Sequence, residues 1–286
     1  MSHPTARDRD VGRGPLVGPV APPGLHVMTF NLRRPLGRLS GRRADRWSHR
    51  RPRARTLLAD ERPTLLCLQE AVPHQMRDVL AALGPGHRFV GHGRGRQRTG
   101  EGCPIVYDSR RLELIEWRQH ALSEHPDQDG SRSWGNVIPR IAVAARFRDV
   151  ATGSRLGVLN THLDPFSGRS RIRSVAYVRA LVGDDPTIVT GDLNAGDRSR
   201  TVGALLADDL LVDTWTNGGH RLTAAVGTFG GYRMPRPEGS RLDRILVSEG
   251  LTVDRVAINA RRIDGDWPSD HLPVQAVVRV GEGSAA

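Results

Sequence analysis

Short apolar runs recur along the chain, and most of them are followed at once by polar residues. The runs with strand character cover residues 25–32, 64–69, 155–163, 187–193, 244–248 and 273–280. Several lack alternation between apolar and polar positions, so we expect them to be buried on both faces of a sheet. Apolar residues recurring every three to four positions predict helices over 73–83, 170–182 and 201–210.

Three other stretches complete the pattern of predicted elements. Residues 102–122 contain two strand-like runs separated by turn residues, which predicts a hairpin that turns at Asp108–Arg110. Residues 33–52 and 123–139 show neither period and are expected to be long loops, the first of which holds eight arginines. Strands outnumber helices, so the pattern favours an α/β protein in which two packed sheets are covered by helices.

The composition along the chain indicates a simple domain organisation. Residues 1–23 are rich in proline, glycine and charge, which is typical of a disordered tail. Composition does not change abruptly after residue 24, so we expect one domain over 24–282, followed by a short tail over 283–286. Hydrophobic residues make up 38% of the 286 residues, which is ordinary for a soluble globular protein.

The charge is strongly positive, with a formal net charge of +11 and a pI of about 11.2. All 42 basic residues are arginine, since the sequence contains no lysine. Two explanations remain open: the arginines attract polyanions through bidentate contacts with phosphate, or a GC-rich genome has replaced surface lysine by arginine.

The two cysteines and the apolar segments limit the class of protein. Cys67 and Cys103 lie in apolar runs without metal-binding or redox spacing, so each is expected to be a buried thiol. The N-terminus lacks the apolar core of a signal peptide, and no apolar run approaches the ~20 residues of a membrane span. We therefore expect a soluble, cytoplasmic protein.

Polar residues with catalytic chemistry gather at the ends of the predicted strands. They are Asn31, Glu70, His162 with Asp164, Asp192 with Asn194, Asp243, and Asp270 with His271. Any one of them is more often a turn or cap residue than a catalyst. Together they offer hard oxygen ligands for Mg²⁺ and histidines for proton transfer. This combination suits hydrolysis of phosphate esters, which requires charge neutralisation and activation of water.

In these residues the chain resembles the endonuclease/exonuclease/phosphatase superfamily. The motifs that carry the resemblance run in order from TFNLR, LQE, NTHLD and GDLN to RLDRILV and SDHLPV, over about residues 26–275. The resemblance implies a four-layer α/β sandwich with two mixed sheets inside, helices outside and the active site at one edge. It also implies a metal-dependent phosphoesterase, either nuclease or phosphatase, with Mg²⁺ as cofactor and Mn²⁺ as an alternative.

The resemblance assigns a role to each matching position. It implies metal binding by Glu70 and Asn31, with Asp270 adding charge to the metal or phosphate site. It implies that Asp192 positions or deprotonates the attacking water and that Asn194 holds the phosphate. It further implies that Asp243 orients His271, that His162 donates to a phosphate oxygen, and that Glu101 is the carboxylate partner of His162.

For three residues, two roles remain open. Glu101 is either that partner or a solvated loop charge. Asp164 either belongs to the site or caps the following turn. Arg140 either clamps a substrate phosphate or is one surface arginine among many.

The identity of the substrate is not determined by the sequence. Nucleic acid, nucleotides, sugar phosphates and lipid phosphoesters all remain candidates, since fold and shared chemistry do not select the leaving group. No protein partner is indicated, and we expect a monomer. The alternative function is a catalytically silent module of the same fold that binds nucleic acid or a phospholigand.

Overall fold

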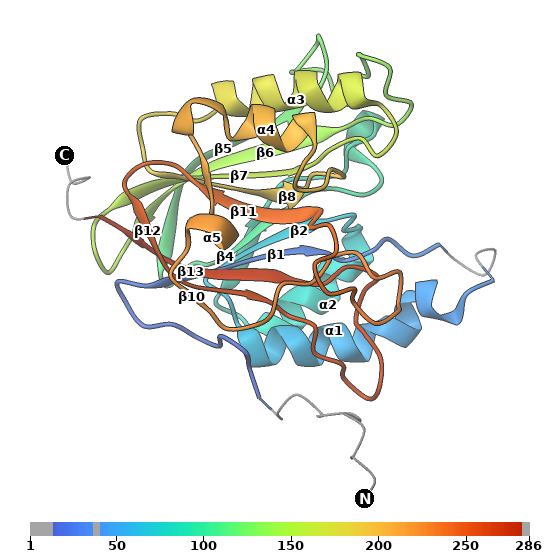
Figure 1. The fold of residues 1–286 in the computed structure, drawn as a ribbon, viewed down its shortest axis with the longest axis vertical. Helices are drawn as coiled ribbons and strands as arrows, with labels where there is room; N and C mark the ends of the chain where they lie inside the picture. Colours follow the sequence, from blue (N-terminus) through green and yellow to red (C-terminus); the bar gives the residue numbers. More distant parts are fainter. Residues whose placement is uncertain (1–13, 37–40, 282–286) are drawn as a thin grey trace, which may run out of the picture.

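The computed structural model describes residues 14–36 and 41–281, which form two β-sheets packed face to face between two layers of helices (Figure 1). The predicted α/β class and four-layer sandwich are confirmed. Residues 1–13 of the expected tail and residues 282–286 lie outside the described residues.

Both sheets mix parallel and antiparallel pairs. The seven-stranded sheet has the order β10 (His220–Arg221), β12 (Leu251–Ile258), β13 (Val274–Val280), β1 (Leu25–Asn31), β2 (Leu65–Gln69), β4 (Ile105–Asp108) and β3 (His87–Val90). The six-stranded sheet has the order β5 (Leu112–Ala121), β6 (Ile141–Asp149), β7 (Arg155–His162), β8 (Thr187–Asp192), β11 (Asp243–Val247) and β9 (Val212–Asp213).

The longer helices cover the outer faces of the sheets (Figure 1). Helices α1 (Trp47–Glu61) and α2 (Pro73–Leu83) share a cluster of buried side chains with β1 and β2. Helices α3 (Gly168–Ala180) and α4 (Arg200–Leu205) share another with β7 and β8. A single turn of helix, α5 (Thr214–Asn217), packs beside β11 and β12. Apolar residues on both faces of the central strands explain the continuous runs in the sequence.

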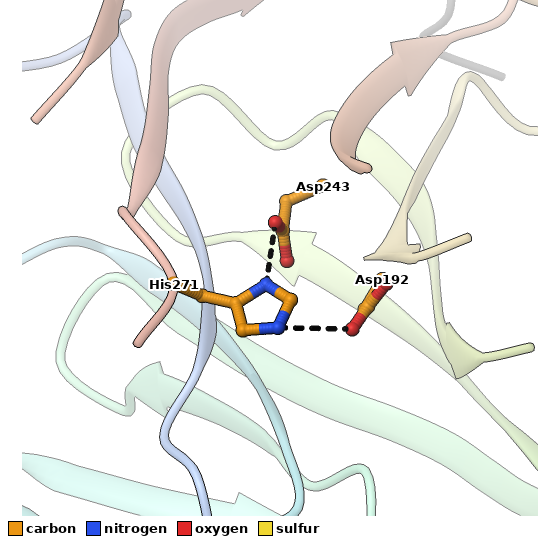
Figure 2. A group of neighbouring side chains, drawn as sticks. All are labelled: Asp192, Asp243 and His271. Carbon is orange, nitrogen blue, oxygen red and sulfur yellow. Dashed lines mark hydrogen bonds and ion pairs between the residues drawn. The ribbon is translucent and has the colours of Figure 1, made fainter. Parts of the chain in front are cut away.

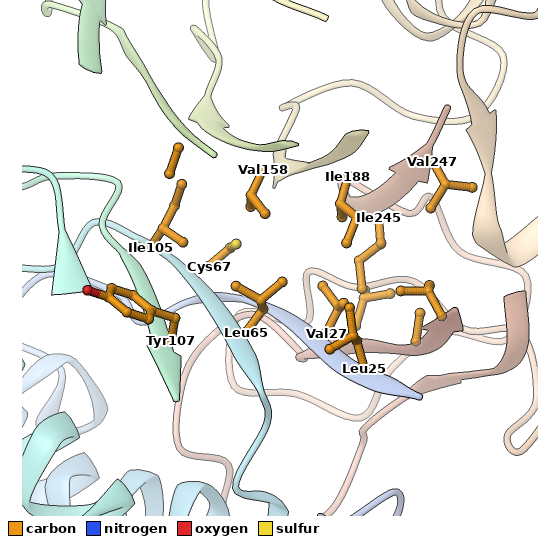
Figure 3. Close-up of a cluster of buried hydrophobic side chains, with 14 of the residues drawn as sticks. Leu25, Val27, Leu65, Cys67, Ile105, Tyr107, Val158, Ile188, Ile245 and Val247 are labelled. Carbon is orange, nitrogen blue, oxygen red and sulfur yellow. The ribbon is translucent and has the colours of Figure 1, made fainter. Parts of the chain in front are cut away.

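The main hydrophobic core lies between the two sheets. Figure 3 shows Leu25, Val27 and Leu65 of one sheet opposite Val158 and Ile188 of the other. These side chains are almost completely buried, so each contributes about 1.5–3 kcal/mol of transfer free energy towards holding the sheets together. Cys67 and Cys103 are free, buried thiols, as expected. Burial raises the pKa of each to about 12, which keeps them protonated and unreactive.

Strand direction brings the polar strand ends to one edge of the sandwich. β1 is parallel to β2, and β7 is parallel to β8, so the carboxyl ends of each pair emerge side by side. β11 runs antiparallel to β8 and begins at that edge, with Asp243 paired to Asp192. β13 runs antiparallel to β1, with Thr29 paired to Val274, so His271 just precedes a strand that begins near the same edge.

The predicted hairpin over residues 102–122 is wrong. β4 and β5 are both strands, and the chain does turn near Asp108–Arg110. However, β4 pairs with β2 and β3, whereas β5 pairs with β6 in the other sheet. The turn is therefore a crossover between sheets. Two adjacent strand-like runs cannot by themselves distinguish these cases, since each pattern is satisfied by any partner strand.

Residues 37–40 of the arginine-rich stretch 33–52 lie outside the described residues, and the rest of the stretch is only partly a loop. A 3-10 turn, Arg43–Asp45, leads into α1, which begins at Trp47 and contains Pro52. Pro52 and the run of arginines hide the helix from a periodicity argument, because proline removes a backbone donor and buried apolar positions become regular only from Ala54 onwards. Predicted helix 201–210 is shorter, since α4 ends at Leu205 and a 3-10 turn follows over Ala207–Asp209.

The described part of the chain begins before the expected boundary at residue 24. The backbone amides of Leu16, Val17 and Gly18 donate to the carboxylate of Glu61 in α1, at 2.7, 3.1 and 3.0 Å. Residues 14–23 therefore run along the domain in the structure. Across the described residues, no helix is long and apolar enough to cross a membrane.

Candidate active site

Asp192, Asp243 and His271 form a buried cluster at the edge where β8 ends and β11 begins (Figure 2). His271 Nδ1 lies 2.8 Å from Asp243 Oδ2, and His271 Nε2 lies 3.7 Å from Asp192 Oδ2. With Asp243 as acceptor, Nδ1 carries a proton and the imidazole ring is fixed in orientation. The contact through which Asp243 is expected to orient His271 is therefore present, and its catalytic role stays a prediction.

The charges in this cluster perturb one another strongly. Burial alone would lower the pKa of His271, but the negative charges of Asp243 and then Asp192 outweigh this effect and raise the pKa to about 10. Burial raises the pKa of Asp192 to about 6, assisted by repulsion from Asp243 and opposed by His271. At neutral pH the ring is therefore an imidazolium, and the carboxylate of Asp192 is poised to exchange a proton.

Asn31 joins two carboxylates at adjacent strand ends. Its Nδ2 donates to Glu70 Oε1 at 3.2 Å and to Asp192 Oδ2 at 2.9 Å. Glu70 follows β2 in a left-handed conformation, with φ of 57°. Burial raises the pKa of Glu70, but hydrogen bonding from the Arg34 amide and the charge of Arg33 outweigh it, so the net pKa is lowered. Glu70 therefore stays ionised, which binding of a cation would require.

Asp270 lies beside this group but contacts arginine. Its Oδ2 is 3.3 Å from Arg33 Nε, and its Oδ1 accepts from Ser269 Oγ at 3.2 Å. Burial raises its pKa, although His271 and Arg33 oppose the shift. Ser269 Oγ also lies 2.7 Å from the backbone oxygen of Asn31, so it connects the segment before β13 to the end of β1.

His162 and Asn194 lie on the other side of Asp192. His162 Nε2 is 3.6 Å from Asp192 Oδ2, and the Asn194 side chain donates to the carbonyl of Leu163 at 2.9 Å. Burial lowers the pKa of His162 well below its usual value, and the nearby Arg140 and Arg94 lower it further. The ring is therefore neutral at physiological pH, so it keeps one N–H donor and one acceptor.

The expected partnership of Glu101 with His162 is not what the structure shows. Glu101 forms an ion pair with Arg94, and its Oε2 lies 3.7 Å from Arg34 Nε. Among the described residues, the carboxylate recorded next to His162 is Asp192. Glu101 is buried, so it is not a solvated loop charge either. Two cations already neutralise it, which leaves its link to His162 as an indirect one through the arginines.

Arg140 and Asp164 form a buried pair near His162. Arg140 Nε lies 3.4 Å from Asp164 Oδ2, and both side chains are at most 3% exposed. Arg140 Nη1 is buried without a hydrogen-bond partner. Asp164 Oδ1 accepts from the amides of Phe166 and Ser167 at 2.9 and 2.7 Å, so Asp164 both caps the turn and neutralises Arg140. An unpartnered buried guanidinium nitrogen is a ready donor for an anion.

The sequence analysis did not predict a network of buried amide side chains between the two sheets, next to the site. Gln69 Nε2 donates to Asn160 Oδ1 at 2.7 Å, and Asn160 Nδ2 donates to the carbonyl of Leu68 at 2.8 Å. The network fixes the end of β2 against β7 of the opposite sheet. The signal in the sequence was Asn160, an amide inside the apolar run 155–163, because a buried polar side chain requires hydrogen-bond partners.

Within the described part of the chain, two groups of side chains have the composition of a cation site. In the first, ligand atoms of Asp192, Asp243 and His271 lie within 4.8 Å of one another. His271 is protonated there and pairs with Asp243, which favours proton transfer over ligation. In the second, carboxylate oxygens of Glu70 and Asp192 converge on Asn31 Nδ2, while Asn31 Oδ1 accepts from the backbone amide of Arg33 at 3.0 Å. This hard-oxygen donor set fits Mg²⁺ better.

Comparison with known proteins places these features in context. The model of the Endonuclease/Exonuclease/phosphatase family matches residues 28–271. A protein of this family from Bacteroides thetaiotaomicron has a similar structure, with a TM-score of 0.83, 29% identity, and coverage of 91% of this chain and 97% of that chain. A mannosyl-6-phosphatase from the same species gives a TM-score of 0.81 at 29% identity, covering 89% of this chain and 99% of that chain.

A curated relative is more distant and much longer. Nocturnin from Drosophila melanogaster is 25% identical over 180 residues, which cover 58% of this chain. The match spans 27% of the length of that relative.

Proposed function

The chain belongs to the endonuclease/exonuclease/phosphatase family, and from this premise we propose that it hydrolyses phosphate esters with the help of a bound divalent cation, Mg²⁺ in the first instance. Members of the family are phosphoesterases, nucleases or phosphatases. A structurally similar member is a phosphatase acting on a mannosyl phosphate, which supports the proposal at the level of reaction class.

The observation that carries the proposal is the convergence on Asp192. Asn31, His162 and His271 each place a nitrogen 2.9–3.7 Å from Asp192 Oδ2. A buried carboxylate whose pKa is raised to about 6 can accept a proton from water at neutral pH. We infer that Asp192 orients and deprotonates the water that attacks phosphorus.

The surrounding residues match the charge of a phosphate ester. The imidazolium of His271, held by Asp243, supplies positive charge next to the reacting group. Neutral His162 donates a hydrogen bond to a phosphate oxygen without losing its proton. Asn194 and the unpartnered Nη1 of Arg140 provide further donors for the phosphate.

Glu70 and Asn31 would hold the cation, and Asp270 would add negative charge beside them. When bound, the cation supplies Lewis-acid stabilisation of the phosphate and of the leaving oxygen. Arg33 Nη1 lies 3.9 Å from Glu70 Oε2 and Arg33 Nε lies 3.3 Å from Asp270 Oδ2, so its positive charge favours the ionised form of both carboxylates. The protein would otherwise concentrate uncompensated negative charge at this edge.

The alternative is a module of the same fold that binds a phospholigand without turnover. Such a protein has no need of the Asp243–His271 pair, which orients a ring for proton transfer, or of a carboxylate with a raised pKa. The described residues retain both features. We therefore favour the enzyme.

A panel of phosphate mono- and diesters, assayed for phosphate or alcohol release with Mg²⁺ and with excess chelator, tests the proposal. We expect turnover of at least one ester with Mg²⁺ or Mn²⁺ and none with chelator. Binding of esters without turnover under any of these conditions would favour the silent module. Full activity in chelator would contradict the role of the cation.

A further inference from the structure

A groove of about 770 Å³ opens beside the catalytic cluster. Arg42 and the segment 227–242 line it, and the segment is linked to the site by backbone contacts. Phe229 pairs with His271 in an isolated bridge, and the two rings lie 4.9 Å apart between centroids. Phe229 therefore lines the groove and also contacts His271, which places the groove next to the catalytic cluster.

The wall of the groove is held in place by hydrogen bonds. The amides of Gly230 and Gly231 donate to the carbonyl of Asp270 at 3.0 and 3.1 Å. Tyr232 donates its hydroxyl to Asp45 Oδ1 at 3.2 Å, which connects the wall to the 3-10 turn that follows Arg42. These contacts bring together two segments that are nearly 190 positions apart in the sequence.

Large apolar side chains stand exposed in this groove. Phe229 is 52% exposed and Met234 is 69% exposed, although both are usually buried residue types. An aromatic ring and a thioether beside a polar site suit contact with a planar or apolar part of a ligand. Neither side chain is needed to fill the main cores, since neither belongs to a buried cluster.

The charge of the groove is positive. Arg42, Arg233 and Arg236 line it, against one acid, Glu238. Arg233 and Arg236 are exposed, and neither has an ion-pair partner recorded within the described residues. The guanidinium groups of Arg233 and Arg236, beside a phosphate-ester site, would attract a second anionic group on the same substrate.

We propose that this groove binds the organic part of the substrate, and that the substrate class is a nucleotide that carries a phosphate besides the one hydrolysed. The base would lie against Phe229 and Met234, and the additional phosphate would contact Arg233 and Arg236. This inference rests on the proposed function. A sugar monophosphate has no base to stack on the ring and no second phosphate for the arginines.

Three phosphate esters, each with a phosphate on a primary alcohol, separate the two recognition elements, and the third also carries a phosphate on a secondary alcohol. They are mannose 6-phosphate, adenosine 5′-monophosphate and adenosine 3′,5′-bisphosphate, and phosphate release with Mg²⁺ gives kcat/KM for each, with the product identified by ³¹P NMR. We expect adenosine monophosphate to exceed mannose 6-phosphate by about tenfold through stacking. We expect the bisphosphate to exceed the monophosphate by about tenfold through the arginines.

Variants assign each preference to its residues. R233Q/R236Q should bring the ratio of bisphosphate to monophosphate close to one, and F229A should reduce the ratio of adenosine monophosphate to mannose 6-phosphate. Ratios within one variant remove any general effect of F229A on the neighbouring His271. The matched control, R88Q/R118Q, changes two exposed arginines on β3 and β5 outside the groove and should leave both ratios unchanged.

Two other outcomes have distinct meanings. Release of phosphate from mannose 6-phosphate with equal or higher efficiency than from both adenosine esters would overturn this inference and leave the proposed function standing. Ratios that persist unchanged in R233Q/R236Q and F229A would also overturn it. Absence of turnover of all three esters with either Mg²⁺ or Mn²⁺ would count against the proposed function itself, and the inference would fall with it.

Discussion

Replacing Asp243 by asparagine should disable the enzyme while preserving the shape of the site. Asp243 Oδ2 accepts the Nδ1 proton of His271 at 2.8 Å, and both side chains are buried. An amide at this position either presents its oxygen to the ring, without the charge, or presents its nitrogen and reverses the tautomer. In both cases the imidazolium loses the neighbouring negative charge that stabilises it most.

The magnitude follows from the pKa of His271. Burial lowers this pKa, yet the neighbouring carboxylates raise it from 6.5 to about 10, a change equivalent to about 5 kcal/mol in favour of the charged ring. Asp243 is the largest contributor and Asp192 and Asp270 share the rest, so its loss should remove about 2–3 kcal/mol. We expect kcat/KM at pH 7 to fall on the order of 10²- to 10⁴-fold, the range for a displaced acid–base group.

Stability should respond to pH in a matching way. A histidine whose folded pKa is raised stabilises the fold fully below pH 6.5, its unfolded pKa, and this contribution disappears as the pH rises through about 10. Urea unfolding of wild type and D243N at pH 6 and pH 10 should therefore show a difference in unfolding free energy that shrinks at the higher pH. Activity equal to wild type, or a difference independent of pH, would refute this reasoning.

Three further changes test other parts of the account. E61Q should lower the unfolding free energy, measured in urea at pH 7, by about 3 kcal/mol. The buried carboxylate accepts five hydrogen bonds, and an amide must leave some of those donors unpaired. A loss below about 1 kcal/mol would contradict this. E70Q should abolish the heat of Mg²⁺ binding in calorimetry, and a wild-type affinity for Mg²⁺ would place the cation elsewhere. R140A should raise KM for the best ester about tenfold or more, and an unchanged KM together with unchanged inhibition by inorganic phosphate would make Arg140 purely structural.

The sequence predicted the central strands and the residues at their ends because these are local signals. Runs such as 187–193 change from apolar to polar within two positions, and parallel pairing then brings Asn31, Asp192 and their neighbours to one edge. The crossover after β4 could not be predicted, because strand partners are chosen by the packing of distant segments. Helix α1 was not predicted because Pro52 and the arginines obscure its apolar period. Its position depends on packing against the sheet more than on a local pattern.

The side-chain partners were predictable only in part. The pair of Asp243 with His271 follows from the two motifs that the resemblance placed together. The position of Glu101 next to Arg94 does not, because charge pairing depends on how the loop over residues 91–102 folds back on the site. The exposed Phe229 and Met234 were likewise invisible, since burial is a property of the folded surface.

The most direct test of the central claim is hydrolysis in water enriched in ¹⁸O, followed by ³¹P NMR of the released phosphate. If water activated at Asp192 attacks phosphorus, each turnover with Mg²⁺ places one ¹⁸O atom in the phosphate and none in the alcohol. In D192N, both the turnover and the labelled phosphate should disappear. Label in the alcohol, or labelled phosphate formed by D192N at the wild-type rate, would contradict the account.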